Sequence, residues 1–353
     1  MKSLFTTSPF AVVASKETAV LWAGRADIKT QLQRIKRRIE SRSDSSLDLM
    51  WANLGAGKSH ALHHLAYLIE EAATGENPIL GGYVEVPEKM SKFSDLYKRI
   101  VKSLSLDEVM RIVNTSSGSE IPPNLRRCAT AFLHGGPEEK GLATDWFYAE
   151  KPYLKDLRRA TGIDSRIESD TEATDLLSSL VKSLEAASGR LVLFIDEFQR
   201  VSRVAERQRN ALLSSLRSVF SNNPSGISII VAAACTIEKN AMDLMPQELR
   251  SIMGMRPAIS LPEMNDSEAI EFVRERFDFF RPDDFQGADF SPFGEEVIRR
   301  AMQRISENEN AALIPRTILQ ALGLVYDDFY ESGVTEFDAD EVDAFLAGLR
   351  WSP

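Results

Sequence analysis

Short apolar runs alternate along the chain with segments whose apolar residues recur every three or four positions. Continuous apolar runs are typical of strands buried on both faces of a parallel sheet, and the intervening spacing is typical of amphipathic helices. Strands are expected from residue 47 and over 79–86, 190–195, 227–235 and 256–261. The pattern therefore predicts an α/β fold built around a parallel sheet.

The last part of the chain shows helical spacing without strand-like runs. Helices are expected from Asn265 to Phe280 with an Asn265/Glu268 capping box, from Ser291-Pro292 to Ile305, from Pro315 to about Tyr330, and from Asp338 to Leu349. Strands that alternate with helices and then give way to a helical set indicate an α/β domain with a small α-helical lid.

Three parts follow from this pattern. We predict an N-terminal lead-in and basic helix over 1–46, an α/β nucleotide-binding core over 47–262, and a C-terminal α-helical lid over 263–353. Residues 106–170 are predicted to be a helical insertion into the core. The aromatic residues of this insertion, Trp146, Phe147 and Tyr153, either pack locally or form a partner surface. Local packing is favoured, because single aromatic residues usually anchor small helical units.

Composition narrows the class of protein. The chain has 353 residues, 43% of them hydrophobic and 27% charged, which is ordinary for a globular protein. Its net charge of −10 argues against a protein that coats nucleic acid over its whole surface, although a local basic stripe is compatible with it. No apolar run approaches the roughly 18–20 residues that span a bilayer, and no secretory signal is evident. Cys128 and Cys235 lack metal-ligand spacing, so buried thiols in a reducing, cytoplasmic compartment are expected.

The first apolar run passes into a short loop that carries two glycines and a Lys-Ser pair. Gly55 and Gly57 permit positive φ, so successive N–H groups can point at an anion at the start of the following helix. Lys58 would reach the β- and γ-phosphates, and Ser59 would hold Mg²⁺. The cofactor-binding residues expected here are Asn53, Leu54, Gly55, Ala56, Gly57, Lys58, Ser59 and His60. The alternative is a glycine turn before an amphipathic helix.

A second candidate group closes the apolar run at 190–195. Asp196 and Glu197 lie where a parallel sheet binds ligands, and two carboxylates there are costly unless they meet a metal, a water or a cation. Asp196 would hold Mg²⁺ together with Ser59, and Glu197 would act as the general base for the attacking water. The cofactors expected are therefore ATP and Mg²⁺. The alternative is a strand-end pair that is hydrogen-bonded to a helix cap.

These motifs resemble those of the AAA+ branch of P-loop ATPases. Ala52 to Ser59 is similar to the Walker A motif except at Ala52, where the motif has glycine, and Phe194 to Glu197 is similar to Walker B. The resemblance implies a P-loop NTPase (AAA+) fold and an oligomer, a ring or a filament, completed between subunits. It implies further roles for five residues: a nucleotide-base pocket at Arg25, a γ-phosphate sensor at Thr236, an arginine finger at Arg250 or Arg256, and a second sensor at Arg316.

The members that the chain resembles most are DNA-associated: replication-initiator ATPases, transposon target-selection ATPases and ATPases of bacterial phage-defence islands. Arginines independently crowd the segment after Asp196-Glu197, where they could contact a phosphate backbone. They are Arg200, Arg203, Arg207, Arg209 and Arg217. The alternative is a surface helix whose arginines pair with acids such as Glu206. On the helix after the phosphate loop, His60, His63 and His64 lack a carboxylate or cysteine at ligand spacing, so a metal site is not expected there.

The function predicted from the sequence is an ATPase that switches conformation or assembly and acts with DNA or a DNA-associated protein complex. An alternative of a different class is an ATP-dependent scaffold that recruits an effector protein without binding DNA. A remodeller that threads polypeptide ranks last, because Lys92-Phe93 is a poor match to an aromatic pore loop.

Overall fold

The computed structural model describes residues 4–41, 44–72, 78–116, 121–332 and 337–351. It forms two compact units. One comprises residues 35–51 and 68–259, and the other comprises residues 1–34, 52–67 and 260–353. No helix within the described ranges is long and apolar enough to cross a membrane.

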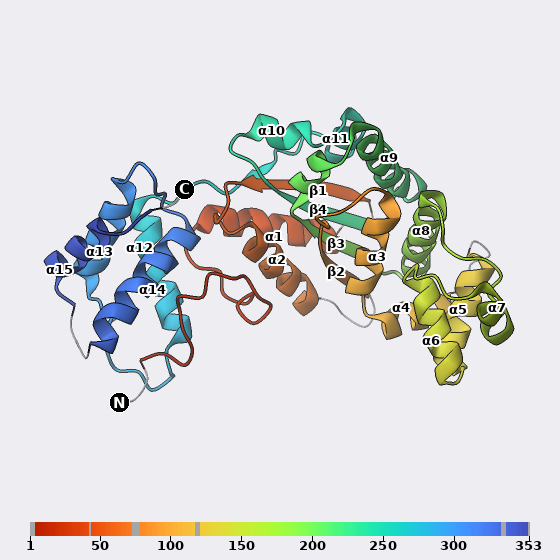
Figure 1. The fold of residues 1–353 in the computed structure, drawn as a ribbon, viewed down its shortest axis with the longest axis horizontal. Coiled ribbons are helices and arrows are strands. Elements are labelled where there is room, and N and C mark those ends of the chain that lie inside the picture. The colour runs from red at the N-terminus through yellow and green to blue at the C-terminus, as the bar shows by residue number, and fades with distance from the viewer. Residues whose placement is uncertain (1–3, 42–43, 73–77, 117–120, 333–336, 352–353) are drawn as a thin grey trace. The chain divides into compact units, whose positions relative to one another are not determined.

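A five-stranded sheet in the order β2-β3-β4-β1-β5 organises the first unit (Figure 1). The strands are β1 (Ser46–Ala52), β2 (Ile79–Glu85), β3 (Arg190–Asp196), β4 (Ile227–Ala234) and β5 (Ile259–Ser260). Strand β3 pairs in parallel with β2 and with β4, with Glu85 beside Asp196 and Phe194 beside Ile230. Every residue of β3 is buried, as a strand covered on both faces requires. The prediction of an α/β fold with a parallel sheet is confirmed.

The fifth strand is shorter than the apolar run at 256–261 predicted. Only Ile259–Ser260 is a strand. Helix α11 (Gln247–Met253) ends at Gly254, which has φ +66°. The side chain of Arg256 then turns back to donate to the backbone oxygens of Ile252 and Met253, so the chain reaches an extended conformation only at Ile259.

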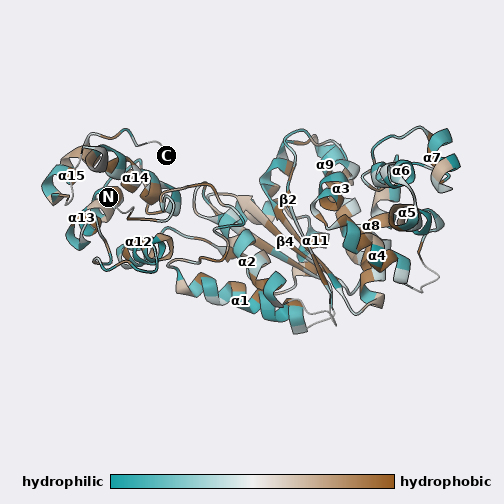
Figure 2. Cartoon of the chain, turned by 90° about the horizontal axis from the view of Figure 1, so that it is seen from below, coloured by the Kyte–Doolittle hydropathy of each residue, from teal (hydrophilic) through white to brown (hydrophobic). Residues whose placement is uncertain are grey.

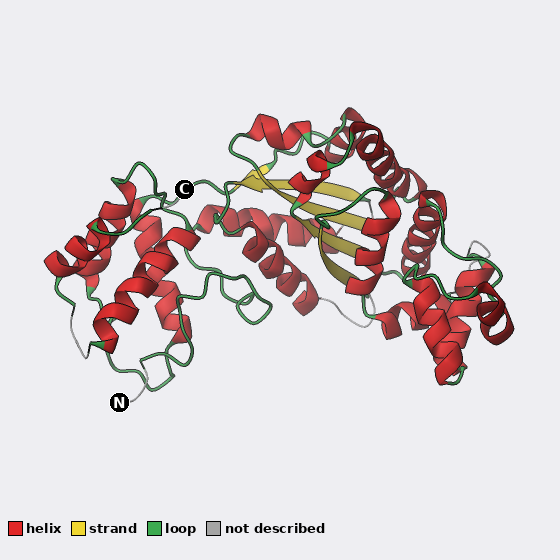
Figure 3. Ribbon diagram, in the orientation of Figure 1, coloured by secondary structure: helices red, strands yellow, loops and turns green. Residues whose placement is uncertain are grey.

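Helices cover the sheet of this unit (Figure 3). Helix α3 (Phe93–Ser103) contacts β2, α8 (Asp170–Ala186) contacts β3, and α9 (Glu206–Asn222) packs on α8. A short 3₁₀ helix, η1 (Phe198–Arg203), and helix α10 (Glu238–Asp243) complete the connections. Colouring by hydropathy shows the apolar residues concentrated on the strands (Figure 2). The sequence pattern did not predict η1, α10 or α11, because each is too short to show helical periodicity.

The described residues of the predicted insertion form four helices that pack in sequence. They are α4 (Leu106–Thr115), α5 (Pro123–His134), α6 (Pro137–Phe147) and α7 (Leu154–Thr161). Trp146 and Phe147 are buried, and Trp146 Nε1 donates to the Ser165 oxygen at 2.8 Å. Tyr153 is 80% exposed, so the packing interpretation is right for the first two aromatic residues and wrong for the third. Tyr153 is the N-cap residue of α7, and Leu157 fills the inward position of that helix.

The second unit holds the C-terminal helices around a phenylalanine-rich core. They are α12 (Asp266–Phe280), α13 (Glu295–Ser306), α14 (Pro315–Glu331) and α15 (Ala339–Ala347). The predicted capping box at Asn265 and Glu268 is confirmed. Helix α13 begins at Glu295 and not at Ser291-Pro292, because Gly294 has φ +83°, outside the helical region. The division into lead-in, core and lid stays a prediction.

The lead-in before residue 26 belongs to this unit and lies along α12. The guanidinium of Arg276 donates to the backbone oxygens of Pro9 and Ala11. Helix α1 (Ala26–Ser41) follows the lead-in, and helix α2 (Lys58–Ala72) follows the loop at 53–57.

Candidate nucleotide-binding site

The loop between β1 and α2 has the backbone conformation that an anion site needs. Gly55 has φ +79° and Gly57 has φ +99°, values that favour glycine. Helix α2 begins directly after Gly57, so the N–H groups of its first turn follow the loop. Ala52 is the last residue of β1, 2% exposed, and is not among the residues with positive φ. Alanine is therefore compatible with a position where the Walker A motif has glycine.

Lys58 keeps its ammonium group against this loop. Its Nζ donates to the Asn53 oxygen at 2.9 Å and to the Ala52 oxygen at 3.3 Å, and the residue is 5% exposed. Two carbonyl oxygens offset part of the cost of burying the charge. A negatively charged ligand on the loop would meet a cation that is already in place.

Arg25, at the end of the lead-in, contacts this loop with its side chain. Its Nη1 donates to the Ala56 oxygen at 2.6 Å, its Nη2 donates to the Pro262 oxygen, and the residue is 5% exposed. Burial lowers the pKa of this guanidinium to about 10, so it stays charged at neutral pH. The sequence assigned Arg25 to nucleotide binding. The observed contacts link it to the loop backbone, through which such a role would act.

The start of α14 lies against the same loop. The backbone N–H of Arg316 donates to the Gly55 oxygen at 3.3 Å. A Cβ atom added to Gly55 would lie 2.9 Å from the Cβ of Arg316, so only glycine fits this approach. The side chain of Arg316 is exposed. Within this unit the fold therefore brings the predicted lid arginine next to the predicted phosphate loop.

Two histidines of α2, His60 and His64, contact the backbone of the lead-in. His60 Nε2 lies 2.7 Å from the Leu21 oxygen, and His64 Nδ1 lies 2.7 Å from the Ala19 oxygen. The indole of Trp22 stacks on the His60 ring with centroids 6.0 Å apart. Burial lowers the pKa of His60 to about 4, against the opposing effect of the Leu21 carbonyl. Burial also lowers the pKa of His64.

This burial predicts a pH-dependent stability. Because the folded-state pKa of His60 lies below the unfolded value, its contribution is complete above about pH 6.5 and is lost as the pH falls toward 4. The full difference amounts to about 3 kcal/mol in the free energy of unfolding. Denaturant unfolding of His60→Gln between pH 7 and pH 5 should show a shallower pH dependence than the parent chain. His134→Gln, at an exposed histidine, should leave the slope unchanged. Equal slopes for all three proteins would contradict the assignment.

The acidic pair lies in the other unit, at the end of β3. Asp196 is 1% exposed, and its Oδ2 accepts from the Tyr83 hydroxyl at 2.8 Å while its Oδ1 accepts from the Glu197 N–H at 2.7 Å. Glu197 has φ +58°, a conformation that L-residues rarely adopt, and its side chain makes no helix-cap bond. The helix-cap alternative is therefore not supported for Glu197.

Sequence reasoning missed two residues that touch this pair. Tyr83 pairs in register with Phe194 across β2 and β3, which brings its hydroxyl to Asp196. Gln199 Nε2 donates to Glu197 Oε2 at 3.0 Å. Arg200 also reaches this oxygen, with Nη2 3.2 Å away. A tyrosine near the end of the strand-like run at 79–86 and a glutamine in the turn after Asp196-Glu197 were the available signals.

The predicted sensor and finger residues follow in the same unit. Thr236 is exposed, two positions after the end of β4. Arg250 donates from Nε to the Met242 and Met245 oxygens at 3.1 and 2.7 Å. Arg256 donates from Nη2 to the Leu47 oxygen at 3.3 Å, besides its bonds to α11. A finger role at either arginine would require these bonds to be given up.

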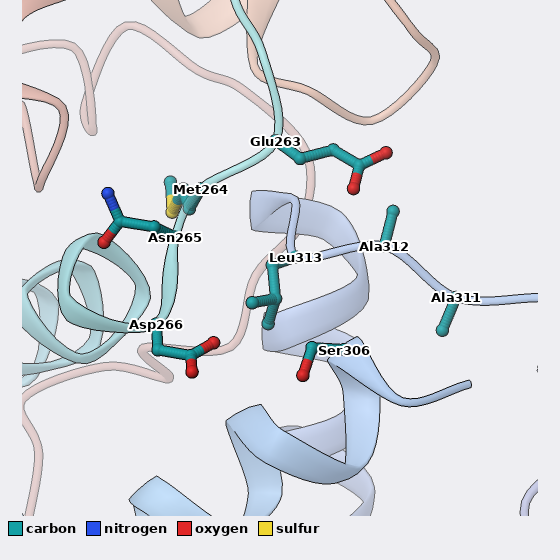
Figure 4. A pocket seen from close by; sticks show the side chains of 8 residues that line it. All are labelled: Glu263, Met264, Asn265, Asp266, Ser306, Ala311, Ala312 and Leu313. Atoms are coloured by element: carbon teal, nitrogen blue, oxygen red, sulfur yellow. The ribbon is translucent and has the colours of Figure 1, made fainter. Parts of the chain in front are cut away.

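A pocket of about 330 Å³ opens among the C-terminal helices (Figure 4). Its lining includes the carboxylates of Glu263 and Asp266, and Asn265, whose side chain already accepts from the Glu268 N–H at 3.0 Å. Two carboxylates would repel a triphosphate, so this pocket does not suit the anionic end of a nucleotide.

A sheet in the order β2-β3-β4-β1-β5, a glycine loop before a Lys-Ser helix start, and an acidic pair after β3 define an AAA+-type P-loop fold. Within that class, residues 84–234 match the family model described as "BREX system ATP-binding protein BrxC/D". The phage-defence resemblance and this match agree. No curated protein sequence matches the chain.

Solved structures of ORC and Cdc6 proteins share the fold. The ADP form of the Aeropyrum pernix ORC2 protein is 16% identical with a TM-score of 0.59, and the match covers 98% of this chain and 73% of that one. The Aeropyrum pernix ORC1 protein in complex with DNA is 10% identical with a TM-score of 0.55, covering 98% and 70%. Cdc6p from Pyrobaculum aerophilum is 11% identical with a TM-score of 0.52, covering 92% and 69%. The predicted AAA+ fold is confirmed.

Proposed function

We propose that this chain binds and hydrolyses ATP and uses the cycle as a switch. The conformation of residues 53–58 carries the proposal, because two positive-φ glycines followed at once by a lysine-initiated helix form an anion cradle. The matched family model describes an ATP-binding protein, and the ORC2 relative is an ADP form. Both support a nucleotide as the anion.

The residues present suit Mg²⁺ with the nucleotide. A serine hydroxyl at Ser59 and a buried carboxylate at Asp196 are the oxygen donors that this ion prefers. When bound, Mg²⁺ neutralises charge on the phosphates. Lys58 adds a fixed positive charge, the N–H groups of the loop orient the phosphates, and Glu197 accepts the proton of the attacking water. We therefore propose that the protein acts as an oligomeric ATPase in the cytoplasm.

Sizing the purified chain tests the switch. We expect a larger species with a non-hydrolysable ATP analogue than with ADP, because an arginine from a neighbouring subunit, Arg250 or Arg256, would complete the site. Steady hydrolysis of ATP that requires Mg²⁺ is expected in the same preparation. A chain that neither binds nor hydrolyses ATP would contradict the proposal.

DNA is the partner that the arginines after β3 suit. Arg203, Arg207 and Arg217 are exposed and Arg209 is half-buried. Over the described ranges, none of the four has an acidic group within ion-pair distance, so pairing with Glu206 is not observed. Arg200 differs, because its Nη1 donates to the Val86 oxygen at 2.8 Å and its Nη2 pairs with Glu197. A phosphate-backbone role therefore rests on the other arginines.

Replacing Arg203 and Arg207 by alanine should abolish stimulation of ATP hydrolysis by DNA and leave the basal rate within about twofold, because phosphate contacts supply most of non-specific affinity. The measurement is hydrolysis against DNA concentration at several salt concentrations. Arg299→Ala is the matched control, since that exposed arginine on α13 pairs with Glu295 at 2.6 Å. Stimulation that survives in the double variant would contradict the DNA role of these residues.

An ATP-dependent scaffold that recruits an effector protein is the second candidate. The exposed Tyr153 favours it, because an aromatic side chain in water on a helical insertion is typical of protein contacts. This candidate predicts ATP-dependent assembly with no response to DNA in the hydrolysis assay.

A further inference from the structure

One side chain ties the proposed base to the neighbouring strand. The Gln199 amide lies between Glu197 and the last residue of β4: its Nε2 is 3.0 Å from Glu197 Oε2, and its Oε1 is 2.8 Å from the backbone N of Ala234. An N–H can only donate, so the amide oxygen must face Ala234 and the amide NH₂ must face the carboxylate. A glutamine carries both a donor and an acceptor, so this one side chain satisfies both neighbours.

The contacts also fix which oxygen of Glu197 is engaged. Gln199 and Arg200 both approach Oε2, and Arg200 is itself held by the Val86 oxygen at 2.8 Å. Over the part of the chain that the structure describes, Oε1 has no hydrogen-bond partner. Two donors on one oxygen orient the carboxylate and leave its other oxygen to accept a proton.

We propose that Gln199 is a positioning residue for nucleotide hydrolysis, which orients the Glu197 carboxylate and couples it to the end of β4. This proposal rests on the proposed function, in which Glu197 is the base. Ala234 lies two residues before Thr236. A shift of the Ala234 N–H would move the oxygen of the Gln199 amide, and the NH₂ group that holds Glu197 would turn with it. A change at the end of β4 therefore alters the orientation of the base.

Two substitutions at this position separate orientation from folding. Gln199→Ala removes both bonds, and we expect kcat to fall about tenfold while KM stays within about twofold, because only the proton-accepting group is misplaced. Gln199→Glu keeps an acceptor for Ala234 but replaces the donor to Glu197 by a second carboxylate. The kcat of this variant should therefore fall at least as far as that of Gln199→Ala, with KM again within about twofold.

The control is Ser202→Ala, which lies in the same 3₁₀ helix and whose hydroxyl donates to the Gln199 backbone oxygen at 2.7 Å. It should keep the parent kcat and KM, and circular dichroism should show all three variants folded. Parent-like kcat in Gln199→Ala would overturn the role of Gln199 alone. Absence of turnover in the parent chain would overturn the proposed function, and the role of Gln199 with it.

Discussion

Glu197→Gln should bind ATP with nearly the affinity of the parent chain and hydrolyse it at least about 100-fold more slowly, which is the usual contribution of a general base. An amide cannot accept the proton of the attacking water. It can still accept from Gln199 and Arg200 through its oxygen, so the local structure should persist. Binding by fluorescent nucleotide titration and turnover by phosphate release measure the two effects separately.

Glu85→Gln is the matched control for this experiment. Glu85 is the last residue of β2, lies beside Asp196 in the sheet register, and approaches Arg200 at 3.9 Å. Its side chain is 61% exposed, so losing its charge should change turnover little. Unchanged hydrolysis in Glu197→Gln would contradict the role of Glu197 as the general base.

Lys58→Ala should weaken ATP binding by at least about 100-fold, because charge-assisted hydrogen bonds to phosphate contribute on the order of 1.5–3 kcal/mol each. The side chain bonds to the Ala52 and Asn53 oxygens, so its removal also loosens the loop. Lys58→Met keeps the stem of the side chain without the charge and should lose binding to a similar degree. Calorimetric titration with ATP and Mg²⁺ is the direct measurement.

Lys36→Ala controls for a general loss of positive charge, since Lys36 pairs with Glu40 at 2.9 Å on α1. It should bind ATP like the parent chain. Parent-like affinity in Lys58→Met would contradict the role of the ammonium group and would favour the loop backbone as the main source of affinity.

The sheet could be predicted from the sequence because burial on both faces leaves a local trace. The run at 191–195 is apolar without interruption, and β3 is buried throughout. The N-terminus of α12 could also be predicted from the sequence, because a capping box is a pattern of neighbouring residues. Both signals lie within a few positions of the element that they specify.

Other contacts of the site join distant positions, and the sequence pattern does not reveal them. Nothing near Arg25 reveals that its guanidinium meets Pro262, 237 positions away. The register that brings Tyr83 to Asp196 spans 113 positions. The exposure of Tyr153 and the contact of His60 with Leu21 likewise depend on which side of α7 and of α2 packs against the rest of the protein.

The guanidinium of Arg25 links two segments of the chain. It is fastened at one end to the Ala56 carbonyl in the loop and at the other to the Pro262 carbonyl, just before the chain enters α12. A displacement of Pro262 must either break a buried, charge-assisted bond or drag the loop with it. One side chain thus links the loop to the start of the helical region, and we expect the two to move independently in a chain without this arginine.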